Sequence, residues 1–270
     1  MAKPISNIGA FTGTIDGITY YTLNGKRVCR KASAPTRDQI QQDPRFAAVK
    51  KNNSEFGGAS TYARAIRSGL GKYVDTFKDH SFHSRLTSCC QKIIKKGRGE
   101  HGQRTINVLN YPEALIGFPL NTKNAILEKL AFLPELQTTV KGIKISWSGM
   151  GKINLDKPPN NASHYVLIAL INSVPGYAYH KRDKKYIPTR TLPRDAMSAA
   201  ASPPLKLSGI SRDIEIFLPF PKDVRIQEEN HENPDKMAHT IWLGIQYGQQ
   251  INAVFHPLET GKSMQCLAVC

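Results

Sequence analysis

The sequence predicts an α+β protein with three parts in chain order. These are an N-terminal β-hairpin arm over residues 1–35, a mainly helical segment over 36–137, and an antiparallel β-sandwich of Ig-like type over 138–270. Three observations predict this class. An Asn-Gly turn signal stands near the N-terminus, apolar residues recur at helical spacing in the middle, and apolar residues alternate with polar ones after residue 138.

The hairpin is predicted by Asn24-Gly25, which stands between β-branched and aromatic residues. A type I′ turn needs two central residues that tolerate positive φ, and Asn-Gly is the strongest short signal for it. Two strands alone are only marginally stable in water, so we expect the arm to pair or pack with another chain. Glycines would allow close backbone approach, although they could equally be ordinary turn glycines. The expected contact residues are Gly9, Phe11, Gly13, Gly17, Tyr20 and Tyr21.

Helical structure is expected to start near residue 37, because Thr36 and Gln39 have the spacing of a capping box. Pro44 interrupts this helix or begins a second one. A further helix is predicted over 84–96, and another over 121–133, ended by Pro134. The second helix would carry one apolar stripe, made of Phe46, Val49, Phe56, Ala63, Ile66 and Leu70.

In the C-terminal half the apolar period changes to two, and Gly, Pro and Asn separate short segments, as is typical of an antiparallel sandwich. We expect a hairpin with its turn at 248–250. Residues 175–211 are rich in Pro, Arg, Lys and Ala, and we expect a long excursion there. The predicted strands are 143–147, 165–172, 214–218, 240–247, 251–255 and 264–269.

Length and composition fit a folded chain of 270 residues, with 40% hydrophobic and 21% charged residues. The longest apolar run, 165–171, is far below the ~20 residues of a membrane span, so no span is expected. The N-terminus lacks the apolar core of a secretory signal, and we expect synthesis in the cytoplasm. The five cysteines include no Cys-x-x-Cys pair, so a disulfide framework or a zinc site of that type is not expected.

The net charge of +16 is concentrated in the N-terminal part of the chain. Residues 1–105 hold 19 Lys and Arg against 7 Asp and Glu, whereas residues 106–270 hold 18 against 14. Such a field attracts polyanions or an acidic protein face. The candidate contact residues are Lys26, Arg27, Arg30, Lys31, Lys92, Lys95, Lys96, Arg98, Lys181, Arg182, Lys184 and Lys185.

Catalytic signatures are weak throughout. Gly71-Lys72 lacks the first glycine and the Ser or Thr of a phosphate-binding loop, and the serines of 146–151 do not stand in Gly-x-Ser-x-Gly. His80 and His83, with Asp75 and Asp79 nearby in sequence, could form a metal site, but exposed polar side chains explain them more simply. We predict no enzyme activity, no cofactor and no metal.

Several features resemble an uncharacterised family of Bacteroidota proteins found on phage-like or mobile elements. The resemblance rests on the opening Gly9-x-Phe11-x-Gly13 with Gly17, the hairpin ending at Arg30, the helix start at Gln39 with Arg45-Phe46, and Ile145-x-Trp147. It covers mainly residues 8–50 and 140–150, and the basic excursion 175–211 departs from it. The resemblance implies an architecture of arm, helices and sandwich, and no catalytic residues.

These observations lead to one expected function and one alternative. We expect a non-enzymatic structural or assembly subunit of a phage virion or related particle, which associates with copies of itself or with other structural proteins of that particle. The arm would add to a neighbour's sheet edge through main-chain hydrogen bonds. The alternative is a sequence-nonspecific nucleic-acid-binding protein that uses the basic N-terminal half.

Overall fold

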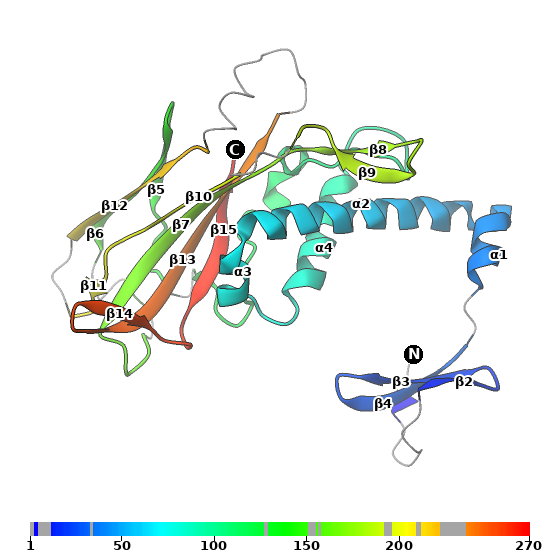
Figure 1. The fold of residues 1–270 in the computed structure, drawn as a ribbon, viewed down its shortest axis with the longest axis horizontal. Coiled ribbons are helices and arrows are strands. Elements are labelled where there is room, and N and C mark those ends of the chain that lie inside the picture. Colours follow the sequence, from blue (N-terminus) through cyan, green and yellow to red (C-terminus); the bar gives the residue numbers. More distant parts are fainter. Residues whose placement is uncertain are drawn as a thin grey trace. The chain divides into compact units, whose positions relative to one another are not determined.

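The computed structural model describes residues 3–4, 12–32, 35–126, 129–150, 155, 158–191, 196–208, 212–221 and 236–270. The chain divides into two compact units, Met1–Lys50 and Lys51–Cys270. Strands account for 40% and helices for 26% of the structure. The predicted mixed class is therefore confirmed, with a strand hairpin at the front, helices in the middle and antiparallel sheets at the C-terminal end (Figure 1).

The first unit holds a four-stranded antiparallel sheet with the strand order β1-β4-β3-β2, here named the arm sheet. After it, Thr36 accepts a hydrogen bond from the Gln39 amide and the Gln39 side chain accepts one from the Thr36 amide, which completes the predicted capping box. The elements are β1 (Lys3–Pro4), β2 (Gly13–Ile15), β3 (Ile18–Leu23), β4 (Lys26–Lys31), α1 (Arg37–Gln42) and the 3-10 helix η1 (Pro44–Phe46).

The second unit is built on a large antiparallel sheet with the path β10-β7-β13-β14, to which β11 and β15 add at β7 and β13. A smaller sheet has the order β12-β6-β5, and β8 pairs with β9 as a separate hairpin. The strands are β5 (Glu135–Thr139), β6 (Gly142–Met150), β7 (His164–Val174), β8 (Tyr177–His180), β9 (Lys185–Pro188), β10 (Met197–Ala201), β11 (Leu205–Lys206), β12 (Arg212–Pro219), β13 (Ala238–Ile251), β14 (Val254–Pro257) and β15 (Ser263–Val269).

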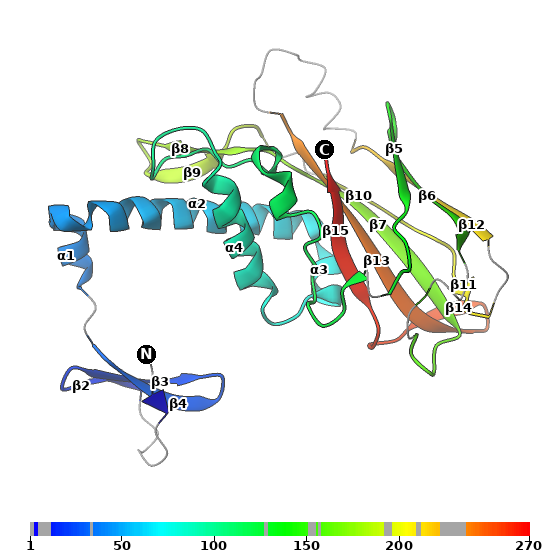
Figure 2. The ribbon, with the colours of Figure 1, turned by 180° about the vertical axis from the view of Figure 1, so that it is seen from behind.

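Helices cover one face of the large sheet, and the smaller sheet covers the other (Figures 1 and 2). Ile66 and Ile93 pack with Trp242 in the first core, and Ile145 and Ile216 pack with Leu243 in the second. The helical elements are α2 (Ala47–Leu70), α3 (Lys72–Phe77), α4 (Phe82–Ile94), η2 (Val108–Asn110) and η3 (Pro112–Ala114). No helix in the described part of the chain combines the length and apolar character needed to cross a membrane.

Strand β7 is buried at every one of its 11 residues, because it lies between the helices and the smaller sheet. Its alternate side chains enter the two different cores. This explains why the sequence of β7 is a continuous apolar run, whereas β12 alternates between exposed and buried residues.

Two expectations about helices are wrong. The stripe predicted on the second helix is not wholly buried, since Val49 and Phe56 are exposed and the burial of α2 begins only at Glu55 and Gly58. No α-helix is present in the described residues of 121–133, which form turns, a 3-10 position at Ile126 and an isolated bridge at Leu130. The Asn121 side chain and Asp79 accept hydrogen bonds from the backbone amides of Lys123 and Thr122, which holds the chain in a turn.

Two further expectations concern loops. The turn after β13 lies at Asn252-Ala253, where both residues have positive φ, and not at 248–250. The segment 175–211 contains secondary structure of its own. It holds the hairpin of β8 and β9 as well as β10 and β11, which extend the edge of the large sheet along β7.

Candidate functional site

The arm sheet contains two tight hairpin turns, at Asp16-Gly17 and at Asn24-Gly25. All four residues have positive φ, between 47° and 75°. These values identify type I′ turns, whose twist matches that of the flanking strands. Gly17 is therefore a turn glycine, and the predicted Asn24-Gly25 hairpin is present.

Side chains of the arm sheet are largely exposed. Within residues 12–32 and 35–50, Val28 is the one buried side chain, at 9% exposure. It lies opposite Tyr21 in the register of β3 and β4. Ile15 and Leu23 are 53% and 51% exposed. This part of the sheet thus buries little apolar surface of its own, which is the usual source of stability for a small sheet.

Four of the candidate cations lie on β4. Lys26, Arg27, Arg30 and Lys31 are all exposed, and the guanidinium carbon of Arg30 lies 5.9 Å from the centre of the Tyr21 ring. Because side chains alternate along a strand, Lys26 and Arg30 share one face of the sheet and Arg27 and Lys31 share the other. The arm sheet is therefore cationic on both faces.

The remaining arm residues differ in how they are placed. Gly13 lies in β2 opposite Tyr20, and a Cβ added at Gly13 or Gly17 would meet no atom within 4 Å. Tyr20 and Tyr21 are half-buried on neighbouring positions of β3. Gly9 and Phe11 lie outside the described residues. The structure therefore brings four of the six predicted contact residues into one sheet.

A second basic surface, here named the hairpin surface, is formed in the second unit by 95–98 and 181–185. Tyr186 of β9 packs on Gly58 of α2, where a Cβ would lie 2.7 Å from the tyrosine ring. The hairpin β8–β9 therefore lies along α2, as Figure 1 shows. The turn after α4 lies along α2 as well, because Ser54 Oγ donates to the carbonyl of Gly102 at 2.6 Å.

An ion pair between Glu55 and Arg104 lies beneath the hairpin surface. Arg104 donates to both carboxylate oxygens, at 2.7 and 2.8 Å, and through Nη1 to the carbonyl of Lys95 at 3.0 Å. Burial by itself would raise the pKa of Glu55, but the hydrogen bonds from Arg104 and from the Gly102 amide hold it below its usual value. The carboxylate is thus neutralised by its own partners, and it does not offset the exposed lysines around it.

The cations of the hairpin surface point to solvent. Lys95, Lys96, Arg98, Lys181, Arg182, Lys184 and Lys185 are exposed. Lys96 lies over the Tyr111 ring at 5.9 Å, and Lys185 lies 3.9 Å from Asp183. Lys92 is also exposed, one turn earlier on α4. The candidate cations form three segments of the sequence, 26–31, 92–98 and 181–185. The last two contribute to the hairpin surface, and the first is β4 of the arm sheet.

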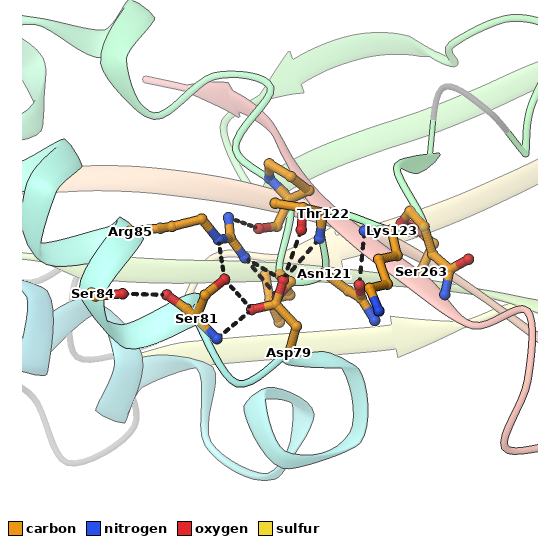
Figure 3. Close-up of polar contacts among 11 residues, drawn as sticks. Asp79, Ser81, Ser84, Arg85, Asn121, Thr122, Lys123 and Ser263 are labelled. Atoms are coloured by element: carbon orange, nitrogen blue, oxygen red, sulfur yellow. Dashed lines mark hydrogen bonds and ion pairs between the residues drawn. The ribbon is translucent and has the colours of Figure 1, made fainter. Parts of the chain in front are cut away.

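Asp79 belongs to a structural cluster and not to a metal site. Its carboxylate accepts hydrogen bonds from the Ser81 amide and hydroxyl, from Arg85, and from the amide and hydroxyl of Thr122 (Figure 3). Burial opposes ionisation of Asp79, but these donors hold its pKa far below the ordinary range. The cluster ties the start of α4 to the loop 118–124.

Neighbouring groups do not complete a metal site with Asp79. Asp75 pairs with Lys78, and burial lowers the pKa of His83, helped by the charges of Arg67 and Lys78. Within the described ranges, no three His, Cys, Asp or Glu side chains are grouped as metal ligands would be.

One serine–histidine contact resembles part of a catalytic triad. Ser173 Oγ and His239 Nδ1 lie 2.9 Å apart, on the paired strands β7 and β13. Both side chains are buried, at 1% and 7% exposure, so the hydroxyl has no open path to a substrate. The pair serves to satisfy polar groups inside the sheet.

Comparisons of the chain with protein-family models, with curated proteins and with solved structures find no match. The candidate site therefore rests on the geometry of the arm sheet and the hairpin surface. Sequence reasoning missed Glu55 and Arg104, which lie 49 residues apart and share no motif. It also missed Lys236, an isolated lysine that the fold places near Arg98.

Proposed function

We propose that this protein is a non-enzymatic structural or assembly subunit of a phage virion or a related particle, made in the cytoplasm and then built into that particle. The observation that carries the proposal is the exposed apolar surface of the arm sheet, above all Ile15 and Leu23. A sheet that buries so little within one chain gains stability when another chain covers it.

The sheet edge supplies a route for this association. Among the described residues, β2 is an outer strand of the arm sheet and pairs only with β3. We propose that its other edge presents backbone groups to a neighbour. A strand from a second copy, or from another structural protein of the particle, could extend the sheet there by main-chain hydrogen bonds. Val49 and Phe56 of α2 are further exposed apolar residues that an assembly could bury.

Two finer points belong to the same proposal. We propose that the chain belongs to the uncharacterised family of Bacteroidota proteins found on phage-like or mobile elements, supported by the residues that carry the resemblance. We also propose an Ig-like arrangement for the two packed sheets, supported by antiparallel pairing and by Trp147 buried between them. An experimental structure that gives the strand connections of this region at high resolution tests the second point.

Deletion of residues 1–31 tests the assembly function. Size-exclusion chromatography with light scattering should give a mass above 30.0 kDa for the full chain and a mass near that of one chain for the deletion variant. Circular dichroism should show that the second unit remains folded, since it is a separate compact unit. An assembly state that does not change after the deletion would contradict the proposal.

Nucleic-acid binding is the second candidate function, and the hairpin surface is the observation that favours it. Seven exposed cations from two distant segments gather there, with Tyr179 half-buried among them. Such a surface would bind phosphates without reading sequence, and affinity should fall steeply with salt.

A matched pair of variants tests this second function. Lys184→Gln should weaken oligonucleotide binding at low salt and reduce the salt dependence. Lys206→Gln should leave the affinity and its salt dependence unchanged. Lys206 is paired with His164 at the start of β7, whereas the hairpin β8–β9 follows the other end of β7, about 30 Å along the strand. Equal effects of the two variants would contradict a role for the hairpin surface.

A further inference from the structure

A small pocket opens where five segments distant in sequence meet. Its volume is about 190 Å³. It is lined by the turn after α4, the chain around η2, the chain just before β8 and just after β9, and Lys236, two residues before β13. The residues that decide its chemistry are Arg98, Thr105, Asn110, Tyr177, Thr189 and Lys236.

Backbone and side-chain hydrogen bonds hold the walls of this pocket in place. Ile106 and Tyr177 exchange amide–carbonyl hydrogen bonds of 2.9 and 2.8 Å, and Thr189 donates its amide to the carbonyl of Gly176 at 2.8 Å. The Asn107 side chain donates to the carbonyl of Lys236 at 3.0 Å, which fixes the segment that carries this lysine. The pocket is therefore preorganised, so a ligand would not have to order its walls.

The charge in the pocket selects the kind of ligand. Arg98 and Lys236 both line it, and the described residues of the lining include no carboxylate. Within the described residues, neither cation forms an ion pair. A cationic ligand would be repelled, and an apolar ligand would desolvate two charges without compensation. An anion would be attracted by both cations. The hydroxyls of Thr105 and Thr189 donate to the backbone carbonyls of Arg98 and Gly176, so they hold the walls of the pocket in place.

The size of the pocket narrows the choice further. Pockets for drug-sized ligands are typically about 300–1,000 Å³, so this one suits a single anionic group of a larger molecule. Tyr177 and the apolar side chains of Ile106 and Leu109 form one wall, against which an uncharged part of the ligand could lie. A phosphate group attached to an organic residue has this combination of charge and size.

We propose that this pocket binds the phosphate group of a nucleotide, with Arg98 and Lys236 as its cationic ligands. The nucleotide is either free or part of a polynucleotide strand. The site lies in the second unit and does not require the arm sheet, so the inference is independent of the proposed assembly function.

Binding measurements on the full chain test this inference, with AMP, adenosine and an oligothymidylate as probes. Arg98→Gln and Lys236→Gln should each weaken phosphate binding about tenfold or more, because each removes a charge-assisted hydrogen bond. Lys206→Gln is the control, since it removes the same charge from an exposed residue of β11, outside both the pocket lining and the hairpin surface. Asn110→Ala is a further pocket variant that leaves the net charge unchanged.

The outcomes separate the two sources of phosphate. Binding of AMP but not adenosine, weakened by the pocket variants and not by Lys206→Gln, supports a free nucleotide. Binding of the oligothymidylate alone, weakened by the same variants, supports a strand. If no probe binds, or if the pocket variants behave as Lys206→Gln does, the inference is overturned. Light scattering on the same samples reports assembly separately, so failure of one proposal is distinguishable from failure of the other.

Discussion

Arg104 and Glu55 form a bidentate ion pair that joins the turn after α4 to α2. The distance from Arg104 Nε to Glu55 Oε1 is 2.7 Å, and that from Nη2 to Oε2 is 2.8 Å. The Gly102 amide donates to the same carboxylate at 2.9 Å. Because the carboxylate is nearly fully buried, these three donors are what make its burial tolerable.

Replacing Glu55 by Ala should therefore lower the free energy of unfolding by about 3 kcal/mol, because the Arg104 charge and the Gly102 amide lose their acceptor. Urea unfolding followed by circular dichroism measures the change. Glu113→Ala is the control, since Glu113 is exposed and should change stability by less than about 0.5 kcal/mol. Similar losses of unfolding free energy for the two variants would contradict a stabilising role of the Glu55–Arg104 ion pair.

Gly57 and Gly58, neighbours in α2, should respond oppositely to replacement by Ala. A Cβ at Gly57 meets no atom within 4 Å, so Ala should stabilise the helix by about 0.5–1 kcal/mol. A Cβ at Gly58 would lie 2.7 Å from the Tyr186 ring, and overpacking there should cost about 1–3 kcal/mol. Thermal unfolding should show a higher Tm for the first variant and a lower Tm for the second. Shifts of the same sign would contradict the packing of the hairpin on α2.

Asp79 should make stability depend on acid pH. Its pKa is far below the ordinary value of 3.8 in the folded chain, so its contribution to stability is complete above that pH and is lost as the pH falls further. The Asp79→Asn variant should lose about 2–3 kcal/mol near neutral pH. Its free energy of unfolding should also decline less between pH 5 and pH 3 than that of the original chain. The reason is that the variant has lost one carboxylate whose pKa is lowered by folding.

Asp183→Asn is the matched control for Asp79, because it removes an exposed carboxylate that faces only His180 and Lys185. It should lose less than about 1 kcal/mol and keep the acid dependence of the original chain. If Asp79→Asn and the original chain show parallel stability curves on acidification, the cluster around Asp79 is not the acid-sensitive element.

The local elements were predictable where neighbouring residues determine the conformation. Asn24-Gly25 determines its turn by the positive φ that both residues adopt, and Thr36 determines a helix start by its own hydrogen bonds. Strands β7, β13 and β15 of the large sheet were predictable from their apolar runs, whereas β10 and β11 lie in the segment 175–211 that was expected to be an excursion. In contrast, the turn at Asn252-Ala253 was misplaced, because alanine gives no signal for positive φ.

The tertiary arrangement needed the structure. Phe56 fits a helical stripe with Ala63, but it is 53% exposed, whereas Ala63 is buried. Helical spacing alone therefore does not show where along α2 the packing contacts begin. The segments that carry Lys95 and Tyr186 both lie along α2, through Arg104 on Glu55 and through the Tyr186 ring on Gly58, and these contacts join residues far apart in the sequence. Composition showed that cations were abundant, but it could not show which ones share a surface.

Exposed apolar residues of the arm sheet should be required for assembly but not for folding. Leu23→Glu and Ile15→Glu place a charge where we propose that another chain is buried, and burial of an unpaired carboxylate is strongly unfavourable. Each variant should lower the mass measured by light scattering toward 30.0 kDa. Val140→Glu makes the same change in charge at a residue that is 92% exposed in the second unit, and it should leave the mass unchanged. A loss of assembly in all three variants would point to charge alone and against a specific role of the arm sheet.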